Sequence, residues 1–315
     1  MNVLMTGGFG FIGKHVIRVI RDLNESHSVT VFSDPQAAET NANFAKEYDL
    51  KVITGDVRDA TGVMEAFASE PPDVAVHLAA LTGVEKCHRD PSLAFSVNVY
   101  GSYNVIMGSA NAGAKLVFIS SREVYGEGVL PRTSEDSPLA PNNLYGVTKE
   151  LGERLIKWAH LKFGLRYSVL RLTNVYGPEG EQYNIQAMIR SAFQDGEIPL
   201  RGGAQLMNLV YVGDVAAAIA RCLTNSRTTN ETFNIGSDQD LPVREILDEL
   251  ISELEMPVEI RGKPMRKGET LNFYPDLAKM KEYFDDLPKT QLKEGLRTTI
   301  AWYKAQINDG FQAGR

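Results

Sequence analysis

The chain has 315 residues, of which 43% are hydrophobic and 23% are charged, which indicates a folded globular protein with room for about two domains. These proportions exclude a disordered, collagen-like or fibrous chain. Forty acidic residues against 33 basic ones give a net charge of −7 without a lysine- or arginine-rich run, so nucleic acid is excluded as a partner, whereas a small phosphorylated ligand is not.

The cysteines and the amino-terminal segment indicate a reducing compartment. Cys87 and Cys222 stand far apart, in neither CxxC nor CxxH spacing, so we expect neither disulfides nor a metal site. The first residues lack the basic and apolar segments of a signal peptide, and no apolar run reaches the roughly 18 residues that span a bilayer. We therefore expect a cytoplasmic protein without a membrane partner.

Short apolar runs alternate with longer amphipathic segments through the first half of the chain. The runs have the length of buried strands, and the segments repeat apolar residues every three or four positions, as helices do. This alternation predicts an α/β fold, a Rossmann-type doubly wound parallel sheet with helices on both faces. The expected strands are residues 3–5, 29–32, 52–53, 74–78, 116–119 and 167–172, and the clearest helices are 12–23 and 147–159.

After residue 173 the composition shifts to loops rich in Gly, Pro and Gln, followed by further helical segments. We expect a smaller C-terminal α/β domain there, while the strand-like residues 232–235 return to the first sheet. The expected division is residues 1–173 plus about 209–236 for the first domain and about 174–208 plus 237–315 for the second. The helical segments are 185–193, 212–223, 243–254 and 292–307.

A glycine-rich turn follows the first expected strand and opens the first helix. Gly7 permits the tight turn, Gly10 lets backbone N–H groups approach a pyrophosphate, and Gly13 allows close packing of the helix. The helix N-terminus adds positive potential at the same place. In this context the spacing indicates a dinucleotide site rather than an ordinary glycine turn.

Acidic residues at the ends of the next two strands suggest which dinucleotide binds. Asp34 lies about 20 residues after Gly13, where a ribose-binding acid is expected. No lysine or arginine occurs between residues 33 and 45 to meet a 2′-phosphate, so NAD is favoured over NADP. Asp56 follows the third strand and is placed to meet the adenine edge, although an ordinary helix cap is an equal interpretation.

Tyr145 and Lys149 stand one helical turn apart on one face of a predicted helix. An ammonium group that close favours the phenolate, which makes Tyr145 a credible general base. Ser121 ends a predicted strand, and ligands bind at the carboxyl ends of strands in an open α/β sheet. We therefore expect Ser121 to hydrogen-bond the hydroxyl that Tyr145 deprotonates, whereas His77 is expected to be structural.

These motifs resemble those of the extended short-chain dehydrogenase/reductases, in particular the NAD-dependent epimerase/dehydratase group that acts on nucleotide sugars. The resemblance covers nearly the whole chain. It implies a Rossmann domain for NAD, a C-terminal nucleotide-sugar domain, and a homodimer joined through the helices that carry Asn98 and Tyr145. The landmarks are TGGFGFIG (6–13), GDV (55–57), HLAA (77–80), NVYG (98–101), SSREVYG (120–126), YGVTK (145–149), RLTNVYGP (171–178), LVYVGDVA (209–216) and FNIGS (233–237).

Residue by residue, the resemblance implies roles for matching positions. Ser121, Tyr145 and Lys149 match the substrate-hydroxyl serine, the base and the lysine that grips the nicotinamide ribose. Besides the glycines, Asp34, Asp56, Tyr145 and Lys149, cofactor contacts are implied for Phe11, Ile12, Val57, Leu78, Ala79, Ala80 and Asn98. Substrate contacts are implied for Thr82, Ser121, Arg122, Asn174, Asn184, Arg201 and Arg266, with Asn174 and Arg266 near the diphosphate.

Three positions depart from the family pattern. Met207 stands where an arginine usually contacts phosphate, and Arg201 is the candidate replacement. Asp34 is displaced by one residue from the usual position of the acid, which weakens the preference for NAD. Arg122 and Glu123 stand where dehydratases carry Asp and Glu, and where decarboxylases carry Ser and Glu.

The expected chemistry begins when Tyr145 takes the proton of the sugar C4 hydroxyl while a hydride passes to NAD, which leaves a 4-keto sugar. Return of the hydride to the opposite face needs no further acid, whereas 4,6-dehydration needs one that Arg122 cannot supply. Glu123 is either an acid/base residue or the structural partner of Arg122. We expect 4-epimerisation, with dehydratase, decarboxylase or 4-ketoreductase activity as alternatives. Retention of Ser121 and Lys149 disfavours a non-catalytic dinucleotide-binding regulator.

Overall fold

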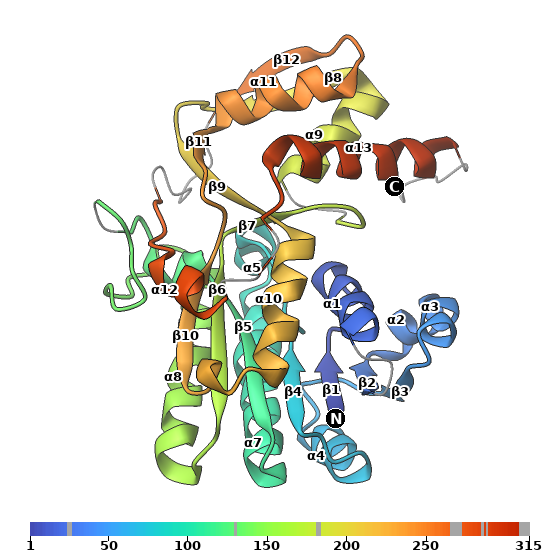
Figure 1. Ribbon diagram of the computed structural model, residues 1–315, viewed down its shortest axis with the longest axis vertical. Coiled ribbons are helices and arrows are strands. Elements are labelled where there is room, and N and C mark those ends of the chain that lie inside the picture. Colours follow the sequence, from blue (N-terminus) through green and yellow to red (C-terminus); the bar gives the residue numbers. More distant parts are fainter. Residues whose placement is uncertain are drawn as a thin grey trace.

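A parallel sheet organises the larger part of the molecule (Figure 1). The computed structural model describes residues 1–23, 27–128, 131–180, 184–264, 273–284, 287 and 289–308. Within them, seven strands pair in the order β10-β6-β5-β4-β1-β2-β3, and every neighbouring pair is parallel, which confirms the doubly wound arrangement. The strands are β1 (Asn2–Thr6), β2 (Ser28–Ser33), β3 (Lys51–Thr54), β4 (Val74–His77), β5 (Lys115–Ser121), β6 (Tyr167–Leu172) and β10 (Glu231–Ile235).

Helices cover both faces of this sheet because successive strand side chains point to opposite sides. Val3 and Met5 join the core beneath α1 (Phe11–Leu23) and α10 (Val212–Thr224). Leu4 joins the core beneath α4 (Ala60–Ser69), α7 (Ser102–Ala112) and α8 (Leu144–Phe163). The shorter elements are α2 (Pro35–Thr40), α3 (Ala42–Glu47), α5 (Val84–Arg89), α6 (Pro91–Phe95), the π-helical η1 (Ser96–Gly101), and the 3₁₀ helices η2 (Arg122–Tyr125) and η3 (Ser226–Thr228).

The rest of the chain forms a smaller α/β unit with its own hydrophobic core, which includes Ile189, Leu247 and Leu296. One of its sheets has the strand order β11-β9-β7, and the other pairs β12 with β8. Residues 209–211, expected in the first domain, belong to β9 and therefore lie in the three-stranded sheet of the smaller unit. The elements are β7 (Asn174–Tyr176), α9 (Asn184–Asp195), β8 (Glu197–Arg201), β9 (Leu206–Tyr211), β11 (Asp240–Pro242), α11 (Val243–Leu254), β12 (Glu259–Lys263) and α13 (Leu292–Asn308), while α12 (Ala278–Tyr283) contacts β10.

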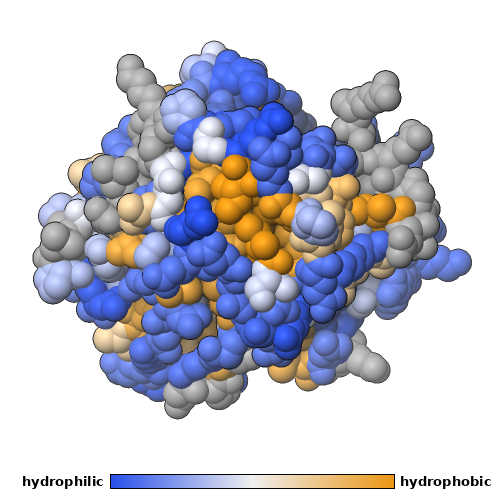
Figure 2. Space-filling view, turned by 90° about the horizontal axis from the view of Figure 1, so that it is seen from above, coloured by the Kyte–Doolittle hydropathy of each residue, from blue (hydrophilic) through white to orange (hydrophobic). Residues whose placement is uncertain are grey.

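The carboxyl ends of the parallel strands face the smaller unit, as Figure 1 shows. Ligand sites in open α/β sheets lie at this edge. Seen from the side of the smaller unit, the surface carries an apolar patch near its centre surrounded by hydrophilic residues (Figure 2). None of the helices in the described parts of the chain is long and apolar enough to cross a membrane.

Candidate active site

The turn between β1 and α1 leaves no room for side chains. Gly7 has a φ of +69°, and a Cβ added to it would lie 2.6 Å from the backbone nitrogen of Ala79. A Cβ on Gly13 would lie 2.5 Å from the Gly8 carbonyl oxygen, so α1 starts directly against the turn. Gly10 N–H donates to the Gly7 carbonyl at 3.0 Å. Such bare backbone at a helix N-terminus, with Phe11 and Ile12 beginning the helix, fits a dinucleotide pyrophosphate.

The two acids expected near the adenosine both hydrogen-bond to neighbouring groups of the chain. Asp34 is exposed after β2, and its Oδ1 accepts the Ala37 N–H at 2.9 Å, which caps α2. Asp56 follows β3 and pairs with Arg58, with 2.5 Å between Oδ2 and Nη2. Hydrogen bonds from Arg58 lower the pKa of the Asp56 carboxyl. The roles of Asp34 and Asp56 toward ribose and adenine stay predictions, as does that of Val57.

His77 closes a buried chain of hydrogen bonds at the end of β4. Thr6 Oγ1 donates to His77 Nδ1 at 2.6 Å, and His77 Nε2 donates to Ser102 Oγ at 2.9 Å. Ser102 Oγ in turn donates to the Asn98 carbonyl at 2.5 Å. Burial, helped by the charge of Lys149, lowers the pKa of His77 to about 3. The ring is therefore neutral, which supports a structural role.

Asn98 holds the segment after β4 against α8. Its Oδ1 accepts the Leu81 N–H at 2.7 Å, and its Nδ2 donates to the Leu81 carbonyl at 3.0 Å and to Thr148 Oγ1 at 3.1 Å. Thr148 lies one residue before Lys149. Asn98 therefore positions the loop through these contacts, while its own contact with a cofactor stays a prediction. The loop carries the other predicted contacts Leu78, Ala79, Ala80 and Thr82.

Tyr145 and Lys149 occupy the first turns of α8, as the spacing predicts. The helix starts here because Asn143 caps it, with Oδ1 accepting the Gly146 N–H at 2.9 Å. Lys149 Nζ lies 5.9 Å from the centroid of the Tyr145 ring and donates to the Ile119 carbonyl at 2.8 Å. Burial lowers the pKa of Lys149 to about 8. The half-buried phenol thus has a desolvated cation beside it.

Ser121 is the last residue of β5, and Glu123 follows it in η2, beside the start of α8. Ser121 Oγ accepts the Glu123 N–H at 3.2 Å. Both Glu123 oxygens have partners: Oε1 lies 2.9 Å from Arg122 Nη2, and Oε2 accepts from Asn143 Nδ2 at 2.7 Å. Glu123 and Arg122 therefore form an ion pair that also braces the cap of α8, which favours the structural interpretation of Glu123.

The substrate residues expected in the smaller unit are spread over two sheets. Asn174 begins β7, and its Nδ2 donates to the Asn208 carbonyl at 3.2 Å. Arg201 ends β8 and donates to the Pro264 carbonyl at 3.0 Å. Asn184 begins α9, and Arg266 lies outside the described residues.

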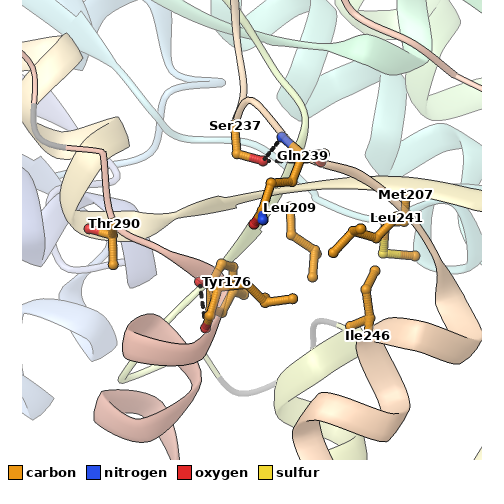
Figure 3. A pocket seen from close by; sticks show the side chains of 9 residues that line it. Tyr176, Met207, Leu209, Ser237, Gln239, Leu241, Ile246 and Thr290 are labelled. Atoms are coloured by element: carbon orange, nitrogen blue, oxygen red, sulfur yellow. Dashed lines mark hydrogen bonds between the residues drawn. The ribbon is translucent and has the colours of Figure 1, made fainter.

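A small pocket opens between β7, β9, β11, α11 and the start of α13 (Figure 3). It has a volume of about 10 Å³, which suffices for a single water molecule. Met207 and Leu209 line it together with Tyr176 and the polar residues Ser237, Gln239 and Thr290. Met207 pairs with Leu241 across the β9–β11 ladder, so the position where the family usually has an arginine packs against apolar residues here.

Three contributors to the site carry a weaker sequence signal. Asn143 precedes Gly146 by three residues, a helix N-cap pattern that could have been found. The roles of Thr148 and Thr6 could not be predicted from the sequence, because their partners Asn98 and His77 lie 50 and 71 residues away in the chain. Within the described ranges, no group of three or more His, Cys, Asp or Glu side chains is placed to hold a metal ion.

Residues 3–236 match the NAD dependent epimerase/dehydratase family. The chain belongs to this family. It is 32% identical over 311 residues to a Methanocaldococcus jannaschii protein provisionally named UDP-glucose 4-epimerase, covering 96% of this chain and 98% of the relative. The structure is similar to that of a Thermotoga maritima UDP-glucose 4-epimerase with UDP-glucose (TM-score 0.85, 29% identity, 98% and 100% of the two chains). It is also similar to a Streptomyces venezuelae dTDP-glucose 4,6-dehydratase with NAD bound (TM-score 0.89, 28% identity, 98% of each chain).

Membership in this family makes the chain an NAD-dependent enzyme. The glycine turn fits the cofactor, because Gly7 and Gly13 let the turn and the start of α1 pack directly against backbone atoms of Ala79 and Gly8, which keeps the N-terminus of α1 at the turn, where a pyrophosphate binds in such folds. NAD is thus the expected cofactor despite the one-residue displacement of Asp34.

Proposed function

We propose that this enzyme is a nucleotide-sugar 4-epimerase that inverts C4 of a uridine-diphosphate hexose through a 4-keto intermediate. The observation that carries the proposal is the arrangement of Tyr145, Lys149 and Ser121 at the carboxyl edge of the sheet, beside a Glu123 whose two oxygens are already engaged. The names of the M. jannaschii and T. maritima relatives support the same activity.

Each catalytic side chain has a distinct task. Tyr145 removes the proton from the C4 hydroxyl and later returns it. Lys149, held by the Ile119 carbonyl, supplies the positive charge that favours the phenolate. Ser121 hydrogen-bonds the same sugar oxygen and keeps it in line with Tyr145. The β1–α1 turn and Lys149 would hold NAD, which would supply the hydride-transfer chemistry at C4.

Glu123 decides between epimerisation and its alternatives. A dehydratase needs an acid for the C6 hydroxyl and a base for the C5 proton. Arg122 cannot donate a proton at neutral pH, and the Glu123 carboxylate is bound to Arg122 and Asn143. With neither group available, hydride return to the opposite face of the keto sugar remains as the outcome.

The test is proton NMR and mass spectrometry of the enzyme with NAD and UDP-glucose, UDP-galactose or UDP-glucuronic acid in deuterated water. We expect the C4 epimer without deuterium at C5, and a Glu123→Gln variant that keeps turnover within about threefold, because a positioning carboxylate contributes less than an acid or base. Deuterium at C5, or loss of water or carbon dioxide, would establish dehydratase or decarboxylase chemistry instead.

The nucleotide sugar is proposed to bind between the sheet edge and the smaller unit. Its proposed contacts are Asn174 of β7, Arg201 of β8, Asn184 and Arg266 from the smaller unit, together with Thr82 and Arg122 from the first domain. We place the domain boundary at residues 173/174 and between β9 and α10. This differs from the expected boundary near 209 because β9 pairs with β7 and β11.

A homodimer joined through the α6–η1–α7 segment and α8 is part of the proposal. Five large apolar side chains are exposed on these neighbouring elements: Phe95 (44%), Tyr100 (50%), Trp158 (43%), Leu161 (85%) and Phe163 (49%). Exposed apolar side chains on adjacent helices favour association. A cytoplasmic location is proposed as well, which the free, buried thiols of Cys87 and Cys222 support.

A further inference from the structure

A buried ion pair lies below the catalytic end of α8. Glu153 follows Lys149 by one helical turn, on the same face as Tyr145. It pairs with Arg171 of β6 at 2.7 Å between Oε2 and Nη2, and each side chain is only 2% exposed. Arg171 Nε adds a hydrogen bond of 3.0 Å to Oε1. This planar, doubly hydrogen-bonded geometry fixes direction as well as distance.

The same helix face is attached to consecutive residues of β5. Lys149 Nζ donates to the Ile119 carbonyl at 2.8 Å, and Ser120 Oγ donates to Glu153 Oε1 at 2.5 Å. The next residue of the strand is Ser121, which is proposed to share the substrate hydroxyl with Tyr145. These two hydrogen bonds along one helix face fix the position of α8 along the direction of β5.

Tyr125 extends the arrangement to the edge of the sheet. Its hydroxyl accepts from Arg171 Nη1 at 2.6 Å and donates to Asn234 Oδ1 of β10 at 2.7 Å. The Arg171 guanidinium lies 4.8 Å from the centroid of the Tyr125 ring. Asn234 Nδ2 donates to the Thr133 carbonyl at 3.0 Å, so the loop that leads from β5 to α8 is fastened as well.

We propose that four side chains, Ser120, Tyr125, Glu153 and Arg171, called the α8 anchor, are positioning residues. They fix the position of α8 along the direction of β5, and this position sets the distance between the Tyr145 and Ser121 hydroxyls. The inference rests on the proposed reaction of those two groups. None of the four needs to touch the substrate, because the anchor acts through the helix and strand that carry them. A shift of about 1 Å at reacting groups is enough to lower a rate strongly.

The hydrogen bonds of Glu153 make its position specific. A carboxylate held by three donors, Ser120 Oγ and Arg171 Nε and Nη2, has one favourable position, because a displacement breaks directional, charge-assisted hydrogen bonds. Lys149 joins α8 to β5 through a single hydrogen bond, to the Ile119 carbonyl. Glu153 adds a second connection through Ser120, and the hydrogen bond of Tyr125 to Arg171 holds the guanidinium in place if α8 moves.

The test uses small changes, because removal of Glu153 would leave the Arg171 charge buried and unpaired and could prevent folding. Ser120→Ala deletes one hydrogen bond to Glu153, and Tyr125→Phe deletes two hydrogen bonds while keeping the ring. Ser109→Ala and Tyr167→Phe are matched controls: the Ser109 hydroxyl donates to the Val105 carbonyl within α7, and Tyr167 lies in the same strand as Arg171. Turnover of UDP-glucose, NAD affinity and amide hydrogen exchange of residues 144–149 are measured on the holoenzyme.

We expect Ser120→Ala and Tyr125→Phe to lower kcat about tenfold while KM and the Kd for NAD change less than about twofold, and to speed exchange at 144–149. The controls should match the wild type in all measurements. Wild-type kcat and exchange in both anchor variants would overturn the inference, as would equal losses in kcat and NAD affinity, which indicate general destabilisation. A wild-type enzyme that converts no nucleotide sugar refutes the proposed function instead, and the exchange measurement then still decides whether the anchor positions α8.

Discussion

The proposed mechanism asks Lys149 to carry a positive charge, yet its side chain is buried. Its amine is desolvated, donates to the Ile119 carbonyl, and lies 5.9 Å from the Tyr145 ring centroid. Removal from water penalises the charged form, which is why the pKa of Lys149 falls from 10.5 to about 8. A group with this pKa loses its charge within about one pH unit of neutrality.

This shift predicts how turnover depends on pH. As pH rises through about 8, Lys149 loses its proton, the phenolate of Tyr145 loses its neighbouring cation, and we expect kcat to fall. The linked stability has the opposite sign: between about 8 and 10.5 the unfolded chain binds the extra proton, so stability from this group rises with pH. Initial rates and thermal unfolding at several pH values check both trends. A kcat that is constant or rises from about pH 8 to 9.5 would contradict the assignment.

Other residues near the chemistry have structural tasks that their type does not reveal. Glu123 has the right type for an acid or base, yet both its oxygens bind Arg122 and Asn143. Asn98 has the right type for a cofactor ligand, yet its amide binds Leu81 and Thr148. A carboxylate or amide whose hydrogen bonds are taken up by neighbouring residues has less capacity left for a substrate or cofactor.

At the scale of elements, the β1–α1 turn shows how close packing makes a cofactor site. Gly7 is required for two separate reasons, its positive φ and the 2.6 Å approach of a Cβ to the backbone of Ala79. Gly113, which ends α7, has a similar φ of +66° but open space around its Cβ position. A comparison of alanine substitutions at Gly7 and Gly113 therefore separates the effect of backbone strain from the effect of steric exclusion.

Gly7→Ala is expected to lower NAD affinity by more than about tenfold, because the backbone of Leu78 and Ala79 must move to make room for the new Cβ. We also expect it to lower the free energy of unfolding by more than the ~1–2 kcal/mol that a strained backbone alone costs. Gly113→Ala should show only the strain and bind NAD normally. Isothermal titration with NAD and chemical denaturation compare the two. Equal NAD affinity in both variants would show that the turn does not cradle the cofactor.

At the scale of the whole molecule, the exposed apolar side chains of the α6–η1–α7 segment and α8 make the proposed dimer testable. Tyr100 is 50% exposed on η1, next to α8. We expect the wild type to sediment as a dimer of the 34.8 kDa chain, and Tyr100→Glu as a monomer, because a carboxylate in an apolar interface is costly. Leu23→Glu, at a 65% exposed position of α1, is the control that should remain dimeric. A monomeric wild type at micromolar concentration would contradict the proposal.

The sequence by itself was sufficient for features that depend on local periodicity and spacing. The expected strands of the parallel sheet and the helices at 12–23, 147–159 and 243–254 all match observed elements, because buried strands and amphipathic helices follow repeats of a few residues. The same holds for the glycine turn and the Tyr145–Lys149 pair, whose members lie within one or two turns of the chain.

Only the tertiary structure decided what depends on contacts between distant segments. Glu153 meets Arg171 and Tyr125 meets Asn234 across 18 and 109 residues, and β9 joins β7 and β11 rather than the first sheet. The partners of Glu123, which favour epimerisation over dehydration, are likewise a result of folding. Burial, hydrogen-bond partners and the resulting pKa values are properties of the packed interior, and a list of residues does not contain them.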